Sequence, residues 1–389
     1  MKPKIPRNVL LLGLVSFFND IASEMIYPIV PIFLTSVLGA PVAVVGFIEG
    51  IAEATASLSK FIFGYISDYT QKRKLFVVLG YCFGAVSKPL MGLAGAWPIV
   101  LFARFIDRTG KGLRTAARDS LLLDNATPRN KGFIFGFHRS FDSLGAVAGP
   151  LLALVLLYLL KENIRLVFFL AFIPGVIAVI LLILFVREKK RVTTQKPQWV
   201  KLSWKILSPR LQLFLIISFI FAAGNSADSF LILRGKQLGL TTTLTVLTYV
   251  LYNIVQTVFA TPAGQLADRI GAKKVFTGGL IVFAFVYFAF GLISNPNWLW
   301  ILFPIYGIYI AATDGVSKAY ISEFIVEKES GTFFGLHQML LAIGGFLASF
   351  IGGILWNVIS PSATFWYGSI MAIFALLLFI FHSSNDYGK

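Results

Sequence analysis

Apolar segments of about 20 residues recur along almost the whole chain, and no other feature restricts its fold as strongly. Hydrophobic residues make up 57% of the 389 residues and charged residues only 13%, whereas soluble domains are about 45–50% apolar and 25% charged. About 20 apolar residues are enough to cross a bilayer as a helix. We therefore predict an all-α, multi-pass membrane protein with transmembrane helices near residues 8–37, 42–66, 75–94, 98–122, 132–160, 164–186, 211–234, 243–267, 275–294, 298–323, 332–356 and 363–382.

The net charge of +16 comes largely from basic residues that gather on every second connection, such as 72–74 and 187–191. Loops rich in Lys and Arg stay in the cytoplasm, so this pattern predicts that both termini are cytoplasmic and that the protein lies in a cytoplasmic (inner) membrane. No basic domain stands outside the membrane, and we expect no nucleic-acid partner. Four basic residues flank predicted outer loops and are exceptions to the pattern: Lys161, Arg165, Arg234 and Lys236.

The chain repeats itself. Gly64-Tyr-Ile-Ser-Asp68 follows the second apolar segment, and Gly264-Gln-Leu-Ala-Asp268 follows the eighth. Residues 132–138 and 331–337 form a second matched pair. Matched landmarks after equal numbers of segments predict two six-helix bundles related by a pseudo-twofold axis, with a site near the midplane. The predicted division is residues 1–186, a basic cytoplasmic linker at 187–210, and residues 211–389.

The motif Gly264-x-x-x-Asp268-Arg269-x-Gly271-x-Lys273-Lys274 resembles the loop motif of the major facilitator superfamily. The first copy departs from it at Tyr69 and Gln71. The resemblance implies a twelve-helix secondary transporter that works by alternating access. It also implies that the glycines permit close helix approach and that the acids pair with cations at a cytoplasmic gate, with Arg118 as the expected partner of Asp68. The gate residues are Gly64, Asp68, Arg118, Gly264, Asp268 and Arg269.

Small residues at Gly136, Gly145 and Gly149, followed by Pro150, resemble a motif of the antiporter branch of that superfamily, usually drug exporters. Ala153 replaces one glycine of the full pattern. The resemblance favours export. Small residues on one face also allow tight packing, and we expect this face to meet a helix of the other half.

The fourth apolar segment, Leu101 to Asp124, carries an unusual number of charges: Arg104, Asp107, Arg108, Lys111, Arg114, Arg118 and Asp119. At about 100° per residue they fall within roughly 140° of one helix face. Each charge costs about 2.5–3.5 kcal/mol in a bilayer on insertion scales, so this face should meet water or protein. Arg108-x-x-x-Gly112 resembles the superfamily's arginine motif associated with proton coupling.

The charged and polar residues within predicted helices are the candidates for substrate binding or proton coupling: Asp20, Glu24, Glu49, Glu53, Arg104, Asp107, Arg108, Lys111, Arg139, Asp142, Asn225, Asp228 and Asn253. In one interpretation they pair with one another and only stiffen the first bundle. In the other, Asp20, Glu53 and Asp142 carry protons. Burial raises the pKa of a carboxyl group and a nearby cation lowers it, so the arrival of a substrate can change its protonation. Arg104, Arg108 and Lys111 would then meet an anionic group of the cargo, since guanidinium binds carboxylate or phosphate at two points.

These patterns predict a secondary active transporter that exports a small anionic or zwitterionic organic solute in exchange for protons. The alternative is proton-coupled uptake of an anionic nutrient or of a metal chelate such as a carboxylate siderophore. An enzyme or sensor built on the same fold is disfavoured, because no catalytic constellation and no phosphate-binding loop is present. We expect no metal site and no cofactor, the proton gradient as the energy source, and a monomer in the bilayer.

Overall fold

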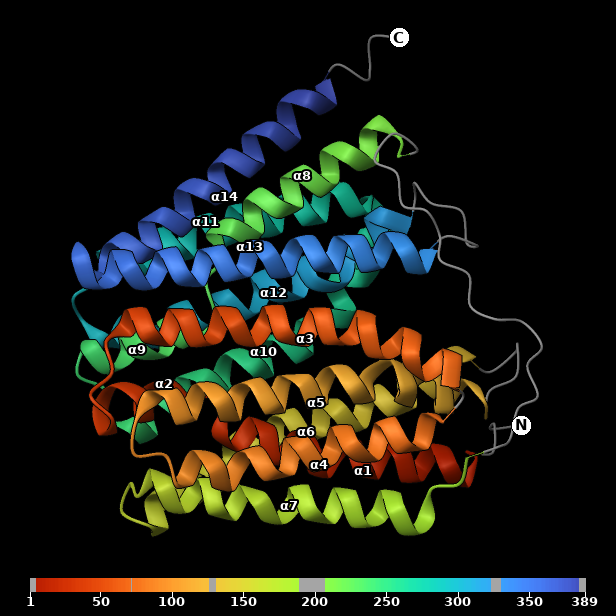
Figure 1. Cartoon of the computed structure of the whole chain (residues 1–389). Helices are drawn as coiled ribbons and strands as arrows, with labels where there is room; N and C mark the ends of the chain where they lie inside the picture. The colour runs from red at the N-terminus through yellow and green to blue at the C-terminus, as the bar shows by residue number, and fades with distance from the viewer. Residues whose placement is uncertain (1–4, 71, 126–130, 189–206, 323–329, 385–389) are drawn as a thin grey trace. The chain divides into compact units, whose positions relative to one another are not determined.

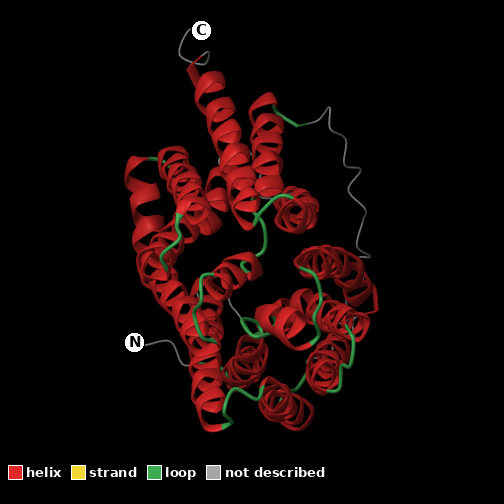
Figure 2. Cartoon of the chain, turned by 90° about the vertical axis from the view of Figure 1, so that its left-hand side faces the viewer, coloured by secondary structure: helices red, strands yellow, loops and turns green. Residues whose placement is uncertain are grey.

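The computed structural model describes residues 5–70, 72–125, 131–188, 207–322 and 330–384. Within these ranges the chain forms only helices and the loops between them, as Figure 2 shows. The helices of the first part are α1 (Arg7–Ile26), α2 (Val30–Ile32), the π-helix η1 (Phe33–Val37), α3 (Val42–Thr70), α4 (Arg73–Gly92), α5 (Trp97–Leu123), α6 (Lys131–Leu159) and α7 (Ile164–Phe185). Those of the second part are α8 (Pro209–Gly224), α9 (Ser229–Gln237), α10 (Thr242–Ile270), α11 (Ala272–Leu292), the 3₁₀-helix η3 (Pro296–Trp298), α12 (Leu299–Ser322), α13 (Ser330–Val358) and α14 (Pro361–Ser384).

The predicted all-α membrane fold is confirmed. Eleven helical segments of the described residues are long and apolar enough to cross a membrane. The remaining predicted span is α5, which has 27 residues and is therefore about 40 Å long at 1.5 Å per residue. Its length suffices to cross a bilayer, and only its charges set it apart from the other spans. The cytoplasmic position of the termini stays a prediction.

The chain forms two compact units: unit 1 is Met1–Gly39 with Thr55–Trp199, and unit 2 is Ala40–Ala54 with Val200–Lys389. The first part of α3 belongs to unit 2 because two glycines let it lie against α13. A Cβ at Gly46 would overlap the carbonyl oxygen of Ser349, and one at Gly50 would come within 2.7 Å of the Phe346 ring. Most of the linker predicted at 187–210 lies outside the described residues.

The same packing scheme occurs within each unit. In unit 1, α1 packs against α6 and α7, and α4 packs against α5 and α7 (Figure 1). In unit 2, α8 packs against α13 and α14, and α11 packs against α12 and α14. These pairs correspond in chain order, so the repeat seen in the sequence is also a repeat of packing.

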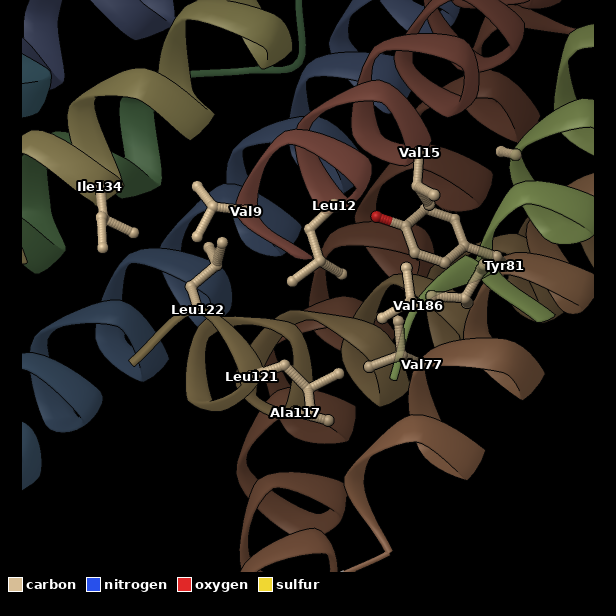
Figure 3. Close-up of a cluster of buried hydrophobic side chains, with 12 residues drawn as sticks. Val9, Leu12, Val15, Val77, Tyr81, Ala117, Leu121, Leu122, Ile134 and Val186 are labelled. Atoms are coloured by element: carbon tan, nitrogen blue, oxygen red, sulfur yellow. The ribbon is translucent and has the colours of Figure 1, made fainter. Parts of the chain in front are cut away.

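A buried apolar cluster in unit 1 holds α1, α4 and α5 together (Figure 3). Val9 and Leu12 of α1 meet Val77 and Tyr81 of α4 and Leu121 of α5, each at most 2% exposed. Lipid tails are as apolar as these side chains, so close packing rather than escape from water stabilises the cluster. It fixes the polar face of α5 against α1 and α4.

The predicted spans 8–37 and 211–234 are interrupted helices rather than continuous ones. The first breaks at residues 27–29, where Pro28 has no N–H to donate. The second breaks between α8 and α9, at residues 225–228. There the backbone groups are satisfied by side chains: Ala227 N–H donates to Ser349 Oγ at 3.1 Å, and Tyr287 Oη donates to the Ser226 carbonyl at 3.2 Å. Irregular backbone persists at such depth only when its polar groups find partners in this way.

Candidate functional site

A buried ion pair joins α4 to α5. Lys88 is completely buried, and its Nζ donates to Asp107 Oδ1 at 2.8 Å and to Ser23 Oγ at 3.3 Å. Ser87 Oγ lies 3.3 Å from the same carboxylate oxygen. The helices approach closely because Gly80 faces the carbonyl oxygen of Gly110. Lys88 therefore neutralises Asp107, the acid among the charged residues in the middle of α5.

The other charges in the middle of α5 are basic. Arg108 Nε lies 3.8 Å from Asp107 Oδ2, so it shares a carboxylate that Lys88 already occupies. The guanidinium of Arg104 is buried and lies 5.8 Å from the centre of the Tyr27 ring, and that of Arg114 lies 4.8 Å from the Tyr81 ring. One Nη of Arg114 has no hydrogen-bond partner among the described residues. This part of α5 itself carries more basic than acidic side chains, and guanidinium groups suit an anionic ligand.

A second charged cluster in unit 1 joins α1, α5 and α6. Arg118 Nη1 donates to Ser16 Oγ at 3.0 Å and lies 3.9 Å from Asp142 Oδ1, and its Nη2 lies 3.2 Å from Asp119 Oδ1. His138 Nδ1 is 3.6 Å from the same oxygen of Asp142. The predicted partner of Arg118 was Asp68, whose side chain lies outside the described part of the structure.

Two of the three predicted proton carriers, Asp20 and Asp142, lie in this cluster, which we call the Asp20 cluster. Asp20 and Asp142 are close enough to repel each other, and Arg114 and Arg118 attract Asp20. Asn19 Nδ2 also donates to Asp20 Oδ1 at 3.1 Å. The arrangement brings two carboxyl groups from different helices under the influence of shared arginines.

The remaining first-half candidates are distributed elsewhere. Glu53 is exposed and belongs to the part of α3 that packs with unit 2. Glu49, one turn earlier, is 6% exposed. Glu24 packs against Gly149 of α6. Lys111 is half-buried on α5, and Arg139 is exposed on α6.

In unit 2 the candidates Asn225 and Asp228 lie at the break between α8 and α9 and face tyrosines. Tyr252 Oη donates to Asp228 Oδ2 at 2.6 Å, and Tyr306 Oη donates to Asp228 Oδ1 at 2.7 Å. Asn225 Nδ2 donates to the Tyr309 hydroxyl at 2.8 Å. By contrast, the Asn253 side chain donates to the carbonyl of Tyr249 within its own helix, 2.9 Å away.

The glycines of the two motifs differ in their packing. In α6, a Cβ at Gly145 would lie 2.8 Å from Asp20 Cβ, and one at Gly149 would lie 2.8 Å from Glu24 Cβ. Both therefore pack against α1 of the same unit, and the prediction that they meet a helix of the other half is wrong. Pro150 follows them within α6. The surroundings of Gly136 are not among those that the structure describes.

The two gate glycines also differ. Gly64 faces Ala116 at 3.2 Å, as close helix packing requires. A Cβ at Gly264 would meet no described atom within 4 Å, so the described residues do not provide the predicted close approach there. Asp268 and Arg269, which follow Gly264, are exposed at the end of α10.

Sequence reasoning missed the neutral partners of these charges. Ser16, Ser87 and Tyr81 were not candidates, because hydroxyl groups inside apolar segments are common and carry no charge. The tyrosines around Asp228 could have been found, since Tyr249 and Tyr252, like Tyr306 and Tyr309, are three residues apart and share a helix face. Among the described residues no group of three or more His, Cys, Asp and Glu side chains could hold a metal ion.

A repeated scheme of helix packing, helices long enough to span a bilayer and charges buried between the helices are typical of a membrane transporter. The chain belongs to the Major Facilitator Superfamily, whose sequence model matches residues 12–255 and 229–388. The resemblance seen in the sequence is thereby confirmed.

Three similar proteins illustrate the relationship. An uncharacterized MFS-type transporter of Methanocaldococcus jannaschii is 37% identical over 384 residues, which is 97% of this chain and 95% of the relative. The quinolone resistance protein NorA of Staphylococcus aureus is 23% identical over 209 residues, 51% of this chain and 52% of NorA. The crystal structure of a POT family transporter in complex with 5-aminolevulinic acid has a TM-score of 0.81 at 14% identity, covering 99% of this chain and 97% of that one.

Proposed function

We propose that this transporter exports a small organic solute with an anionic group across the inner membrane in exchange for protons, and that it works as a monomer by alternating access. One observation carries the proposal: the basic residues in the middle of α5. Asp107 forms an ion pair with Lys88 at 2.8 Å, and Arg104, Arg108 and Lys111 lie within about one turn of Asp107 on the same helix. Guanidinium groups in a site that excludes water bind carboxylate or phosphate strongly and at two points.

The coupling to protons is supported by the Asp20 cluster. Asp20 and Asp142 repel each other when both are ionised, while Arg114 and Arg118 attract Asp20. Such a balance is sensitive to any charge that approaches, because two neighbouring carboxyl groups can share one proton. An anion that engages Arg114, whose guanidinium also attracts Asp20, changes that attraction, so anion binding and the protonation of Asp20 influence each other.

The direction of transport is supported by the glycine motif in α6. Gly145 and Gly149 are tightly packed against α1, and the motif to which they belong is typical of exporters. NorA, a partial relative, is by its name a resistance protein. Uptake of an anionic nutrient or chelate is the second candidate function, since the basic face of α5 would serve it equally well.

Anion binding to purified protein tests the observation on which the proposal rests. Phenylacetate serves as the anionic probe and phenethyl alcohol as its uncharged counterpart, with binding followed by calorimetry. We expect phenylacetate to bind the wild type and to bind Arg108→Gln at least tenfold more weakly, with partial recovery in Arg108→Lys because charge returns without the two-point geometry.

Lys274→Gln removes an exposed charge from α11 and serves as the control that should bind phenylacetate like the wild type. Equal affinity of the wild type and Arg108→Gln would contradict the proposal. Equal binding of phenethyl alcohol would show that apolar contacts, and not the basic residues, hold the probe.

A further inference from the structure

The break between α8 and α9 places a carboxylate among tyrosines. Asp228 accepts hydrogen bonds from Tyr252 and Tyr306, one on each oxygen, at 2.6 and 2.7 Å. Both tyrosines are at most 4% exposed, whereas Asp228 is only half-buried. The phenols hold the carboxylate from the protein side, and its other lone pairs remain available on the accessible side.

Asp228 differs in its partners from Asp107 and Asp142, two other aspartates within membrane-spanning helices. Asp107 has Lys88, and Asp142 has Arg118. No Lys, Arg or His of the described residues lies within 4.0 Å of Asp228. A carboxylate so placed, with neutral donors only, is a strong attractor for a cation from outside the protein.

A second carboxylate lies near the first. Glu49, at 6% exposure, is on the part of α3 that packs with unit 2. A Cβ on Gly46, one turn before Glu49, would lie 3.1 Å from the Phe230 ring, and Ser349, which faces Gly46, accepts a hydrogen bond from Ala227. Glu49 and Asp228 consequently repel each other. A bound cation would turn this repulsion into attraction.

An independent sign of a ligand lies beside the acids. Ser229, which follows Asp228 at the start of α9, is completely buried, and its Oγ has no hydrogen-bond partner among the described residues. A buried hydroxyl without a partner is uncommon in native structures. Ser229 therefore adds a hydroxyl without a partner directly after Asp228 in the chain, and a hydroxyl oxygen can accept one of the three N–H groups of a primary ammonium.

The surroundings favour an organic cation over a metal ion. The ring centres of Tyr252 and Tyr306 are 5.5 Å apart, and those of Tyr306 and Tyr309 are 5.2 Å apart. Rings of this kind add apolar contact and attraction for ammonium groups. Metal ions prefer more anionic ligands than this site supplies.

We propose that Asp228 and Glu49, with the tyrosines and Ser229 beside them, form a binding site for the ammonium group of an organic solute. This site extends the anion-binding proposal, because a zwitterionic cargo has both groups. It is argued from unit 2 alone, so it stands if the basic face of α5 proves not to bind anions.

Calorimetry with phenethylammonium, and with phenethyl alcohol as its uncharged counterpart, tests the site on the purified full-length protein at neutral pH. We expect phenethylammonium to bind the wild type and to bind Asp228→Asn and Glu49→Gln at least tenfold more weakly. Asp228→Glu should keep most of the affinity, which guards against variants that simply misfold. Asp314→Asn, which removes an exposed carboxylate from α12, should bind like the wild type.

Three results would overturn the proposal. The first is no binding of phenethylammonium to the wild type, and the second is equal binding of phenethyl alcohol. The third is displacement of phenethylammonium by sodium chloride but not by an equal ionic strength of choline chloride, which would assign the carboxylates to an inorganic cation. If Asp228→Asn binds phenylacetate like the wild type, the ammonium site and the anion site are independent, and either proposal can fail without the other.

Discussion

Lys88 and Asp107 illustrate how single residues organise unit 1. Both are buried in a medium without water, where each ion alone would be costly, and the 2.8 Å contact between them offsets that cost. Removing one partner should therefore matter more than removing both.

We predict that Lys88→Met lowers the free energy of unfolding by about 3 kcal/mol, because it leaves the Asp107 carboxylate without its closest partner. The double variant Lys88→Met/Asp107→Leu should regain more than half of the loss. Unfolding in mixed micelles measures both, in a double-mutant cycle. Losses that simply add would show that the two side chains do not act as a pair.

At the residue scale the sequence was a good guide to charged residues and a poor one to their partners. The cost of burying a charge makes Asp20, Arg104 and Asp228 conspicuous in an apolar segment. Nothing comparable marks Ser16 or Tyr81, because their hydroxyl groups are tolerated almost anywhere. Which acid meets which base depends on helix rotation, and hydropathy does not report helix rotation.

At the scale of elements, two exceptions to the charge pattern have a structural explanation. Arg165 Nη1 donates to the carbonyls of Gly92 and Ala94 at 2.8 and 2.7 Å, at the end of α4. Arg234 donates to the carbonyls of Phe290 and Ile293 at 3.1 and 2.8 Å, around the end of α11. In each unit an arginine thus satisfies carbonyls that a helix C-terminus leaves without partners.

Arg165→Gln and Arg234→Gln should each lower the free energy of unfolding by about 1–3 kcal/mol, the cost of leaving buried carbonyls unpaired. Chemical unfolding with a spectroscopic readout measures the change. Lys161→Gln, an exposed change in the loop before α7, should stay within about 0.5 kcal/mol of the wild type. An equal effect of all three variants would point to loop charge and not to capping.

The packing of α6 on α1 gives a prediction in which two identical substitutions act oppositely. In Gly149→Ala the new methyl would lie 2.8 Å from Glu24 Cβ and 2.9 Å from the Ile21 carbonyl, so we expect a loss of about 1–3 kcal/mol. Gly278→Ala in α11 meets nothing within 4 Å and should gain about 0.5–1 kcal/mol from helix propensity. Thermal unfolding measures the stability of both variants. A destabilised Gly278→Ala together with an unaffected Gly149→Ala would contradict the packing described.

The positions of the spans could be predicted from hydropathy, because a run of about 20 apolar residues has the length and composition of a transmembrane helix. The interruptions did not follow. Pro28 indicates the first break. Residues 225–228 lie between apolar residues on both sides, so the mean hydropathy of the segment does not reveal the second break. They form a break only because side chains of α11 and α13 satisfy their backbone groups, and these helices lie far away in the sequence.

At the scale of the whole molecule, the repeat explains why unit 1 and unit 2 share a packing scheme yet differ in chemistry. Unit 1 contains the basic residues of α5 and the Asp20 cluster, and unit 2 contains Asp228 among tyrosines. Alternating access needs two bundles of similar construction, but cargo recognition does not need both to be alike. The two units therefore differ in the kind of charge that lies within them.

Transport in proteoliposomes with an imposed pH gradient tests the central claim most directly. The probes are phenylacetate, phenylalanine and phenethylammonium, which share a phenyl ring and differ in charge, and a fluorescent dye inside the vesicles reports proton movement. The account predicts that phenylalanine or phenylacetate moves against the proton flux, and that Asp20→Asn abolishes this coupling. Movement in the same direction as protons would indicate uptake. Movement that ignores the gradient, with Asp20→Asn unchanged, would contradict the account.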